Sequence, residues 1–197
     1  LLNRHGRKPE RIGFVHCVGS RDEKVNNLHC SKVCCITAVK QAIEVKQKLP
    51  DAEVFCFYMD LRMFGRHYEE LYKEAQEKYN IQFIRGRLSE STEDQEGNVV
   101  VKVEDTLLGK PLRIKTGLLV LMVGMEPRAN TRTLARRMGL KSVSDGFIQP
   151  VDEVLHSNYT EIPGLFVAGT CSGPKSIADT LADARSAAFA VADFFKK

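Results

Sequence analysis

Three short apolar runs that alternate with two amphipathic segments constrain the fold of this chain most. Residues 11–19, 53–59 and 81–84 are the apolar runs, and each has the composition of a buried strand. Between them, residues 32–49 and 68–79 place apolar side chains at helical spacing. Ser31 is expected to cap the first helix and Pro50 to end it. The strand–helix–strand–helix–strand order predicts an α/β fold with a parallel, Rossmann-like sheet.

The pattern changes after the third run. Residues 89–97 resemble a polar turn, whereas residues 98–103 and 112–115 alternate around a second turn and predict an antiparallel β-meander. Residues 118–123 form another buried strand. Beyond them we expect a short helix at 133–138, a strand at 165–169, a loop at 171–175 and an alanine-rich helix at 176–195. The predicted organisation is a basic tail (1–10), a Rossmann-like domain with its meander (11–124) and a further domain part (125–197).

Composition excludes several classes of protein. The 197 residues carry a formal net charge of only +4, with basic and acidic residues interleaved, which disfavours nucleic-acid binding. No apolar run has transmembrane length and no signal peptide is visible, so we expect a cytoplasmic chain without direct membrane insertion. The chain opens at Leu1 rather than at methionine, which favours a piece of a longer chain.

Four of the six cysteines gather at the first strand–loop–helix junction. Cys17 ends the first apolar run, twelve residues separate it from Cys30, and Cys34 and Cys35 open the predicted helix. In a chain without signs of secretion, such a set predicts a metal site or cluster before disulfides. Thiolates are the form that binds metal, and the first turn of a helix stabilises the anion.

Spacing alone leaves the nature of this site open. Neighbouring helical residues point about 100° apart, which suits the corners of a [4Fe–4S] cubane better than a single zinc ion. Structural zinc sites also usually contain a C-x-x-C pair, which this stretch lacks. Redox-active or merely buried cysteines are the remaining alternatives. Cys56, in the middle of the second apolar run, is expected to be a core residue.

Several motifs resemble one known family. G-M-E-P-R-A-N-T and G-L-F-V-A-G-T-C resemble segments of the flavin disulfide reductase superfamily. C-V-G-S-R-D, H-C-S-K-V-C-C, Y-M-D-L-R-M-F-G and A-G-T-C-S-G-P-K-S-I-A-D-T together resemble the family of heterodisulfide reductase A subunits. The resemblance covers nearly the whole chain from Arg11. It implies that residues 125–197 are the C-terminal half of an FAD-binding domain, in a protein that carries iron–sulfur clusters.

The resemblance also assigns residues. It implies that Cys17, Cys30, Cys34 and Cys35 hold a [4Fe–4S] cluster and that Lys40 tunes the flavin in a catalytic role. Neither a G-x-G-x-x-G fingerprint nor a ferredoxin-type cysteine run occurs, so the FAD site is incomplete and no NAD(P) binding is expected. The residues expected to contact FAD lie in one loop and helix start: Gly169, Thr170, Cys171, Gly173, Lys175, Ser176 and Ile177.

The implied function is electron transfer between FAD and the cluster in a multisubunit oxidoreductase, with electron bifurcation as a further property of the family. The expected partners are other subunits of a heterodisulfide reductase-like complex, together with ferredoxin, hydrogenase or formate dehydrogenase modules, or a second copy of the chain. The isolated fragment is expected to be inactive. Two alternatives are an NAD(P)H-dependent FAD disulfide reductase and a non-redox zinc or scaffold module that binds partner subunits.

Overall fold

The computed structural model describes residues 2–3, 5–140 and 145–196, and it divides into two compact units. Unit 1 contains Leu1–Val18 and Cys34–Gly124, and unit 2 contains Gly19–Val33 and Met125–Lys197. Unit 1 thus ends at Gly124, and residues 19–33 group with unit 2 instead of with the residues on either side of them. Residues 1 and 4 of the predicted tail and residues 141–144 and 197 of the last part lie outside the described residues.

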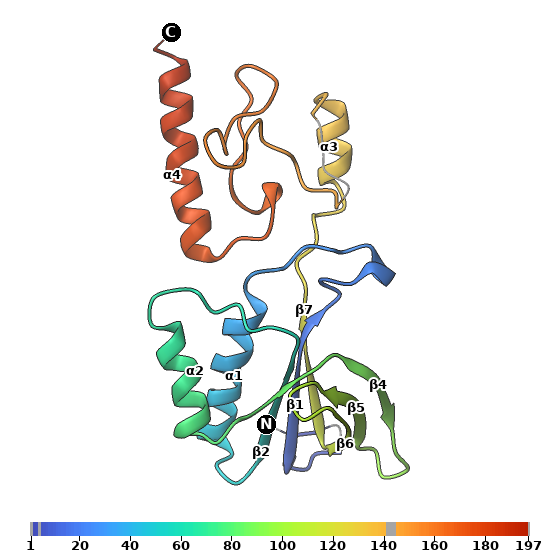
Figure 1. Ribbon diagram of the computed structural model, residues 1–197. Coiled ribbons are helices and arrows are strands. Elements are labelled where there is room, and N and C mark those ends of the chain that lie inside the picture. The colour runs from blue at the N-terminus through green and yellow to red at the C-terminus, as the bar shows by residue number, and fades with distance from the viewer. Residues whose placement is uncertain (1, 4, 141–144, 197) are drawn as a thin grey trace. The chain divides into compact units, whose positions relative to one another are not determined.

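Unit 1 is built around a four-stranded parallel sheet in the order β3-β2-β1-β7 (Figure 1). Residues of β1 pair with β2 on one side and with β7 on the other, which makes β1 a central strand. Two helices connect the strands as expected from the alternating pattern. The elements are β1 (Arg11–Val18), α1 (Cys34–Lys48), β2 (Glu53–Tyr58), α2 (Tyr68–Glu77), β3 (Gln82–Arg85) and β7 (Leu118–Val123).

An antiparallel meander of β4 (Leu88–Glu93), β5 (Val99–Asp105) and β6 (Lys110–Thr116) completes unit 1. The prediction of a polar turn at residues 89–97 was therefore wrong for its first half. The side chains of β4 are largely exposed, so the strand shows no apolar alternation. Its backbone pairing with β5 stabilises it instead, and such pairing leaves no mark on side-chain polarity.

The parallel sheet is covered on both faces. Ile12 and Phe14 of β1 pack with Ala38 and Ala42 of α1 in the helix-side core. Phe57 of β2 instead packs with the meander in a second core. Strands buried on both faces are nearly continuously apolar, which explains why β1 and β2 were recognisable from sequence.

Unit 2 contains two 3₁₀ helices, η1 (Glu23–Val25) and η2 (Gly169–Ser172), and the helices α3 (Thr131–Arg137) and α4 (Ile177–Phe194). A small core of Ala135, Ile148 and Val167 lies within it. The strand predicted at residues 165–169 is not formed among the described residues, which show only an isolated bridge between Tyr159 and Phe166. A strand requires neighbouring strands for its backbone groups, and sequence cannot show whether they are present.

None of the helices in the described ranges combines the length and apolar character that crossing a bilayer requires.

Candidate functional site

The carboxyl end of β1 departs from regular strand geometry at Cys17. The pairing of β1 with β7 shifts register between Val15 and Val18, and Cys17 has a φ of 58°. A positive φ is uncommon for a residue with a side chain, and residues held in such strained conformations cluster at functional sites. Irregularities of this kind re-aim a side chain at the end of a strand. In this case the Cys17 side chain hydrogen-bonds Cys34, the first residue of α1.

The Cys34 thiol is strongly acidic for a cysteine. Its hydrogen bond with Cys17 and the backbone N–H groups of Cys34, Cys17 and Cys35 lower the pKa of Cys34 to about 6, although burial opposes the shift. Cys34 is therefore mostly a thiolate near neutral pH. The thiolate is the form of cysteine that binds metals and attacks disulfides.

Cys35 lies beside this pair in the first turn of α1 and is also buried. Its thiol donates to the backbone carbonyl of Asp60, which follows β2, at 3.7 Å. Cys56 lies deeper in the same unit, where burial raises its pKa and the nearby Cys35 adds to the shift. Cys56 is fully buried in the helix-side core, in agreement with its expected role as a packing residue.

Cys30 belongs to unit 2, whereas Cys17, Cys34 and Cys35 belong to unit 1. Its sulfur accepts a hydrogen bond from the Lys32 backbone N–H at 3.3 Å. Within residues 2–3, 5–140 and 145–196, no group of three or more His, Cys, Asp or Glu side chains has the geometry to hold a metal ion. The structure thus unites part of the predicted ligand set: Cys17 with Cys34, and Cys35 in the same turn.

The loop that carries Cys30 is fixed by a buried polar network within unit 2. Ser31 is fully buried, pairs with the Ser20 hydroxyl at 2.5 Å, and accepts a hydrogen bond from the Met125 backbone N–H at 2.7 Å. The His29 ring donates to the Met125 carbonyl at 2.8 Å. The prediction that Ser31 caps the first helix was wrong, because its hydroxyl serves Met125 and α1 begins only at Cys34.

His16 is a buried residue that sequence reasoning missed. Only 6% of its surface is exposed, and neither ring nitrogen has a hydrogen-bond partner in the described part of the chain. Burial lowers the pKa of His16 to about 4, so the ring is neutral at neutral pH. The only sequence signal was a titratable residue within an otherwise apolar run.

The loop expected to contact FAD is held together by a lysine and an aspartate. Lys175 Nζ donates to Asp183 Oδ2 at 2.6 Å, to Ser172 Oγ at 2.7 Å and to the Gly169 carbonyl at 3.0 Å. Asp183 also accepts from the Gly169 N–H at 2.6 Å and from Asn158 at 2.8 Å. The three donors of Lys175 therefore all have partners within unit 2, and no sequence signal pointed to Asp183.

The remaining residues of the predicted FAD set differ in their surroundings. Thr170 and Ile177 are exposed, whereas the Cys171 thiol donates to the Ala168 carbonyl at 3.1 Å. Gly173 has a φ of 144°, which favours glycine at this turn. Ser176 caps α4 by accepting from the Asp179 N–H at 3.1 Å, and the Asp179 carboxylate accepts from the Ser176 N–H at 3.2 Å. These contacts position the loop, with Thr170 and Ile177 at its surface.

Lys40 lies on α1 in unit 1 and is exposed to solvent. It is five residues beyond Cys35, past the first turn of the helix. Its predicted role toward a flavin stays a prediction.

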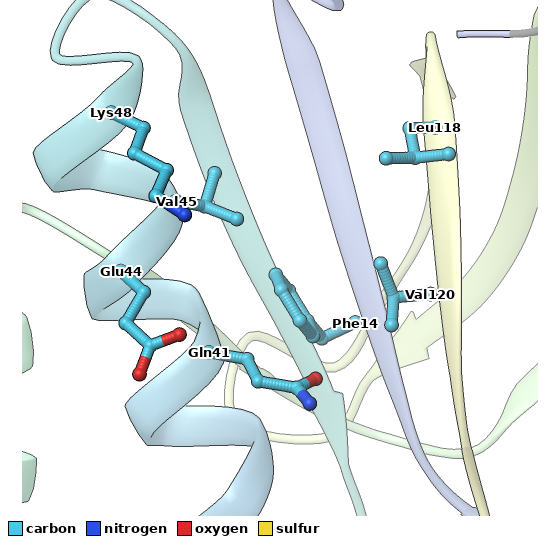
Figure 2. A pocket seen from close by; sticks show the side chains of 7 residues that line it. All are labelled: Phe14, Gln41, Glu44, Val45, Lys48, Leu118 and Val120. Atoms are coloured by element: carbon cyan, nitrogen blue, oxygen red, sulfur yellow. The ribbon is translucent and has the colours of Figure 1, made fainter. Parts of the chain in front are cut away.

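A hollow of about 350 Å³ lies along the later turns of α1, between this helix and strands β1 and β7 (Figure 2). Phe14, Val45, Leu118 and Val120 form its apolar surface, and Gln41, Glu44 and Lys48 line it from α1. No cysteine lines this hollow, so it is separate from the cysteine site.

Comparison with known proteins identifies the family. The model of the family described as pyridine nucleotide-disulphide oxidoreductase matches residues 37–188. The chain belongs to this family. Two thioredoxin reductase structures share the fold, each with a TM-score of 0.61. The enzyme of T. acidophilum is 22% identical over 95% of this chain and 53% of its own, and that of Lactococcus lactis is 18% identical over 93% and 52%. The predicted α/β fold class is thereby confirmed.

Curated relatives confirm the resemblance to the A subunits of heterodisulfide reductases. The iron-sulfur A subunit of the CoB–CoM heterodisulfide reductase of Methanocaldococcus jannaschii is 46% identical over 94% of this chain and 28% of its own length. The A subunit of the H(2):CoB-CoM heterodisulfide,ferredoxin reductase of Methanothermobacter marburgensis is 45% identical over 93% and 28%. The chain thus spans little more than a quarter of these relatives. Family members are oxidoreductases, and the family supports FAD-linked electron transfer.

Proposed function

We propose that this chain is a segment of a flavin- and iron–sulfur-containing electron-transfer protein of the heterodisulfide reductase A type. In this proposal it passes electrons between FAD and a [4Fe–4S] cluster held by Cys17, Cys30, Cys34 and Cys35. The observation that carries the proposal is the hydrogen-bonded pair of Cys17 and Cys34, with a thiolate stabilised at the start of α1. The Methanocaldococcus jannaschii relative is named as an iron-sulfur subunit, which supports the same assignment.

The donor set fits a cluster by its chemistry. Four thiols of one short stretch match the Cys₄ ligation of cubane clusters. Cys34 and Cys35 occupy adjacent helical positions and point in different directions, as ligands of two different irons do. Cys30 precedes Cys34 by four residues, and an extended chain spans roughly 3.3–3.6 Å per residue. The intervening chain is therefore long enough for the Cys30 thiol to bind the same cluster as Cys34.

The FAD part of the proposal rests on unit 2. A bound flavin exchanges electrons in one- or two-electron steps. We propose that Gly169, Thr170, Cys171 and Gly173 shape the loop toward the cofactor and that Ser176 and Ile177 present the start of α4 to it. Lys175 stabilises this loop through Asp183 and does not donate to the flavin, because its ammonium group already donates to Gly169, Ser172 and Asp183. The exposed Lys40 is available to modulate the flavin electrostatically.

The proposal extends to the surroundings of the chain. The relatives are named as subunits of heterodisulfide reductases, which supports a multisubunit complex as the working form. Electron bifurcation, a cytoplasmic location, and exchange with ferredoxin, hydrogenase or formate dehydrogenase modules belong to the same proposal.

Anaerobic reconstitution with iron and sulfide tests the cluster. About four irons and four acid-labile sulfides per chain are expected, as a cubane requires. Cys34→Ser should lose most of both, whereas Cys56→Ser, at a core cysteine in the same unit, should retain them. Zinc bound without sulfide would support the scaffold alternative and contradict the proposal, as would the absence of any iron uptake.

A dithiol–disulfide couple is the second candidate function. The hydrogen bond between Cys17 and Cys34 and the lowered pKa of Cys34 are also features of redox-active thiol pairs. In this case mild oxidation of the metal-free chain would remove two thiols and link Cys17 to Cys34, as peptide mapping would show. Reconstituted chain would then contain no iron, which separates the two candidates.

A further inference from the structure

His16 is an unusual residue for the interior of a parallel sheet. It is more than nine-tenths buried on β1, and both its ring nitrogens are without a hydrogen-bond partner among the described residues. Buried polar side-chain atoms are almost always paired, and an exception in a native protein calls for an explanation. A phenylalanine would fill the same space without burying two polar atoms. The histidine therefore points to a ligand that uses its ring.

The ring of His16 lies on the helix-facing side of the sheet. Phe14, two residues earlier on β1, packs in the same core as Cys34. Residues two apart on a strand share a face, and His16 keeps this alternation because its ring contacts that of Tyr58 at 6.5 Å between centroids. Tyr58 in turn contacts Phe83, which packs against the helix-side core. His16 thus lies two residues beyond Phe14 on the same face, nearer to the carboxyl end of the strands, where α1 begins.

Three cysteines lie at this same end of the sheet. Cys17 directly follows His16, and its positive φ directs its side chain to Cys34. Cys35 donates to the carbonyl of Asp60, two residues beyond Tyr58. The unpartnered imidazole and three thiols therefore occupy one corner of unit 1, contributed by the ends of β1 and β2 and the first turn of α1.

We propose that His16 donates a ring N–H hydrogen bond to a sulfur atom of the cluster proposed for Cys17, Cys30, Cys34 and Cys35, and thereby makes the cluster easier to reduce. The inference rests on the cluster assignment under Proposed function. Reduction adds one electron to the cluster, and the added negative charge is spread over its sulfurs without breaking a bond. A donor fixed at such a sulfur stabilises the reduced form more than the oxidised form, and hydrogen bonds to sulfur are an established determinant of cluster potential.

The surroundings of His16 make this contact effective. The His16 ring packs against the ring of Tyr58, which in turn packs against Phe83. Because His16 is buried, little water competes for its N–H. A hydrogen bond in such a setting is electrostatically stronger than one in water.

A redox titration of the reconstituted chain, monitored by electron paramagnetic resonance with dithionite as reductant, tests the inference. His16→Phe should make reduction less favourable by about tenfold or more, equivalent to about 59 mV for a one-electron couple. His16→Gln keeps an N–H donor and should restore part of this difference. Phe14→Leu, on the same strand and face, should disturb packing without shifting the potential. Equal potentials for wild type and a folded, cluster-loaded His16→Phe would overturn the inference.

A second measurement does not depend on His16→Phe and covers the case in which that variant fails to fold. Pulsed electron paramagnetic resonance on the reduced wild-type cluster, with ¹⁵N-labelled histidine, should show a weak nitrogen coupling. The coupling should persist in His29→Asn and disappear in His16→Gln. Its absence from wild type, or its loss in His29→Asn alone, would overturn the inference. A wild-type chain that binds no iron would instead refute the proposed function itself, so the two failures are distinguishable.

Discussion

Lys175 and Asp183 form a largely buried ion pair at 2.6 Å, with side-chain exposures of 19% and 9%. The pair links the loop before α4 to the body of that helix. Asp183 also holds the Gly169 N–H and Asn158, so one carboxylate fixes both ends of the predicted FAD loop. The buried pair gives this loop a defined conformation that depends on a few side chains.

Replacement of Lys175 by methionine should destabilise unit 2. The substitution leaves the Asp183 carboxylate buried without its cation, and breaking a buried pair in this way costs about 3 kcal/mol. Urea denaturation followed by circular dichroism would measure the change in unfolding free energy. Lys40→Met, at an exposed lysine, is the matched control and should change it by less than about 0.5 kcal/mol. Equal effects of the two substitutions would contradict the assigned role of the pair.

The thiol of Cys34 should titrate near pH 6 in the metal-free, reduced chain. Thiolate absorbance in the ultraviolet, compared with that of Cys34→Ser, would give its pKa. Cys17→Ala removes the largest cause of the shift and should move the pKa up, toward the value of about 8.5 for an ordinary cysteine. A pKa that is the same with and without Cys17 would show that the hydrogen bond does not stabilise the thiolate.

The same shift has a consequence for stability. A group with a depressed folded-state pKa contributes stability that is present above its unfolded pKa and is lost as pH falls through its folded pKa. For Cys34 the window therefore runs downward from about pH 8.5 to about pH 6. Over this range the unfolding free energy of the metal-free wild type should fall relative to that of Cys34→Ala, as denaturation at several pH values would show.

Most of unit 1 could be predicted from sequence because burial on both faces leaves a strong pattern. The apolar runs of β1 and β2 and the helical spacing of α1 were recognisable for this reason. The strand β4 was missed because its side chains are exposed, and residues 165–169 were wrongly taken as a strand because an apolar run does not reveal its neighbours. Long-range pairing is the information that the local pattern lacks.

The candidate site shows the same limit. The spacing of the cysteines predicted that they act together, and the structure unites Cys17 with Cys34. The spacing did not reveal the turn at Cys17, the orphan ring of His16 or the partner of Lys175. These features depend on backbone conformation and on contacts between distant segments, which a single sequence does not encode in any local motif.

Gly86 connects the parallel sheet to the meander at a point where no side chain fits. A Cβ atom at this position would overlap the Glu104 carbonyl oxygen, and the Gly86 N–H donates to the Tyr58 carbonyl at 2.8 Å. Gly86→Ala should therefore lower the unfolding free energy by about 3 kcal/mol, at the upper end of overpacking effects. Gly109→Ala meets no neighbouring atom but has a φ of 62°, and should cost only about 1 kcal/mol. A smaller loss for Gly86→Ala than for Gly109→Ala would refute the steric argument.

Ser31 holds the Cys30 loop through a hydroxyl that serves two partners. Ser31→Ala would leave the partly buried Met125 N–H and the buried Ser20 hydroxyl without this partner, and such losses cost about 1–3 kcal/mol. Chemical denaturation should show a loss of this size, whereas Ser89→Ala, at an exposed serine, should be nearly neutral. The Cys30 thiol should also react faster with iodoacetamide in Ser31→Ala, since its loop opens more often. Unchanged stability together with unchanged Cys30 reactivity would show that the loop is fixed by its other contacts.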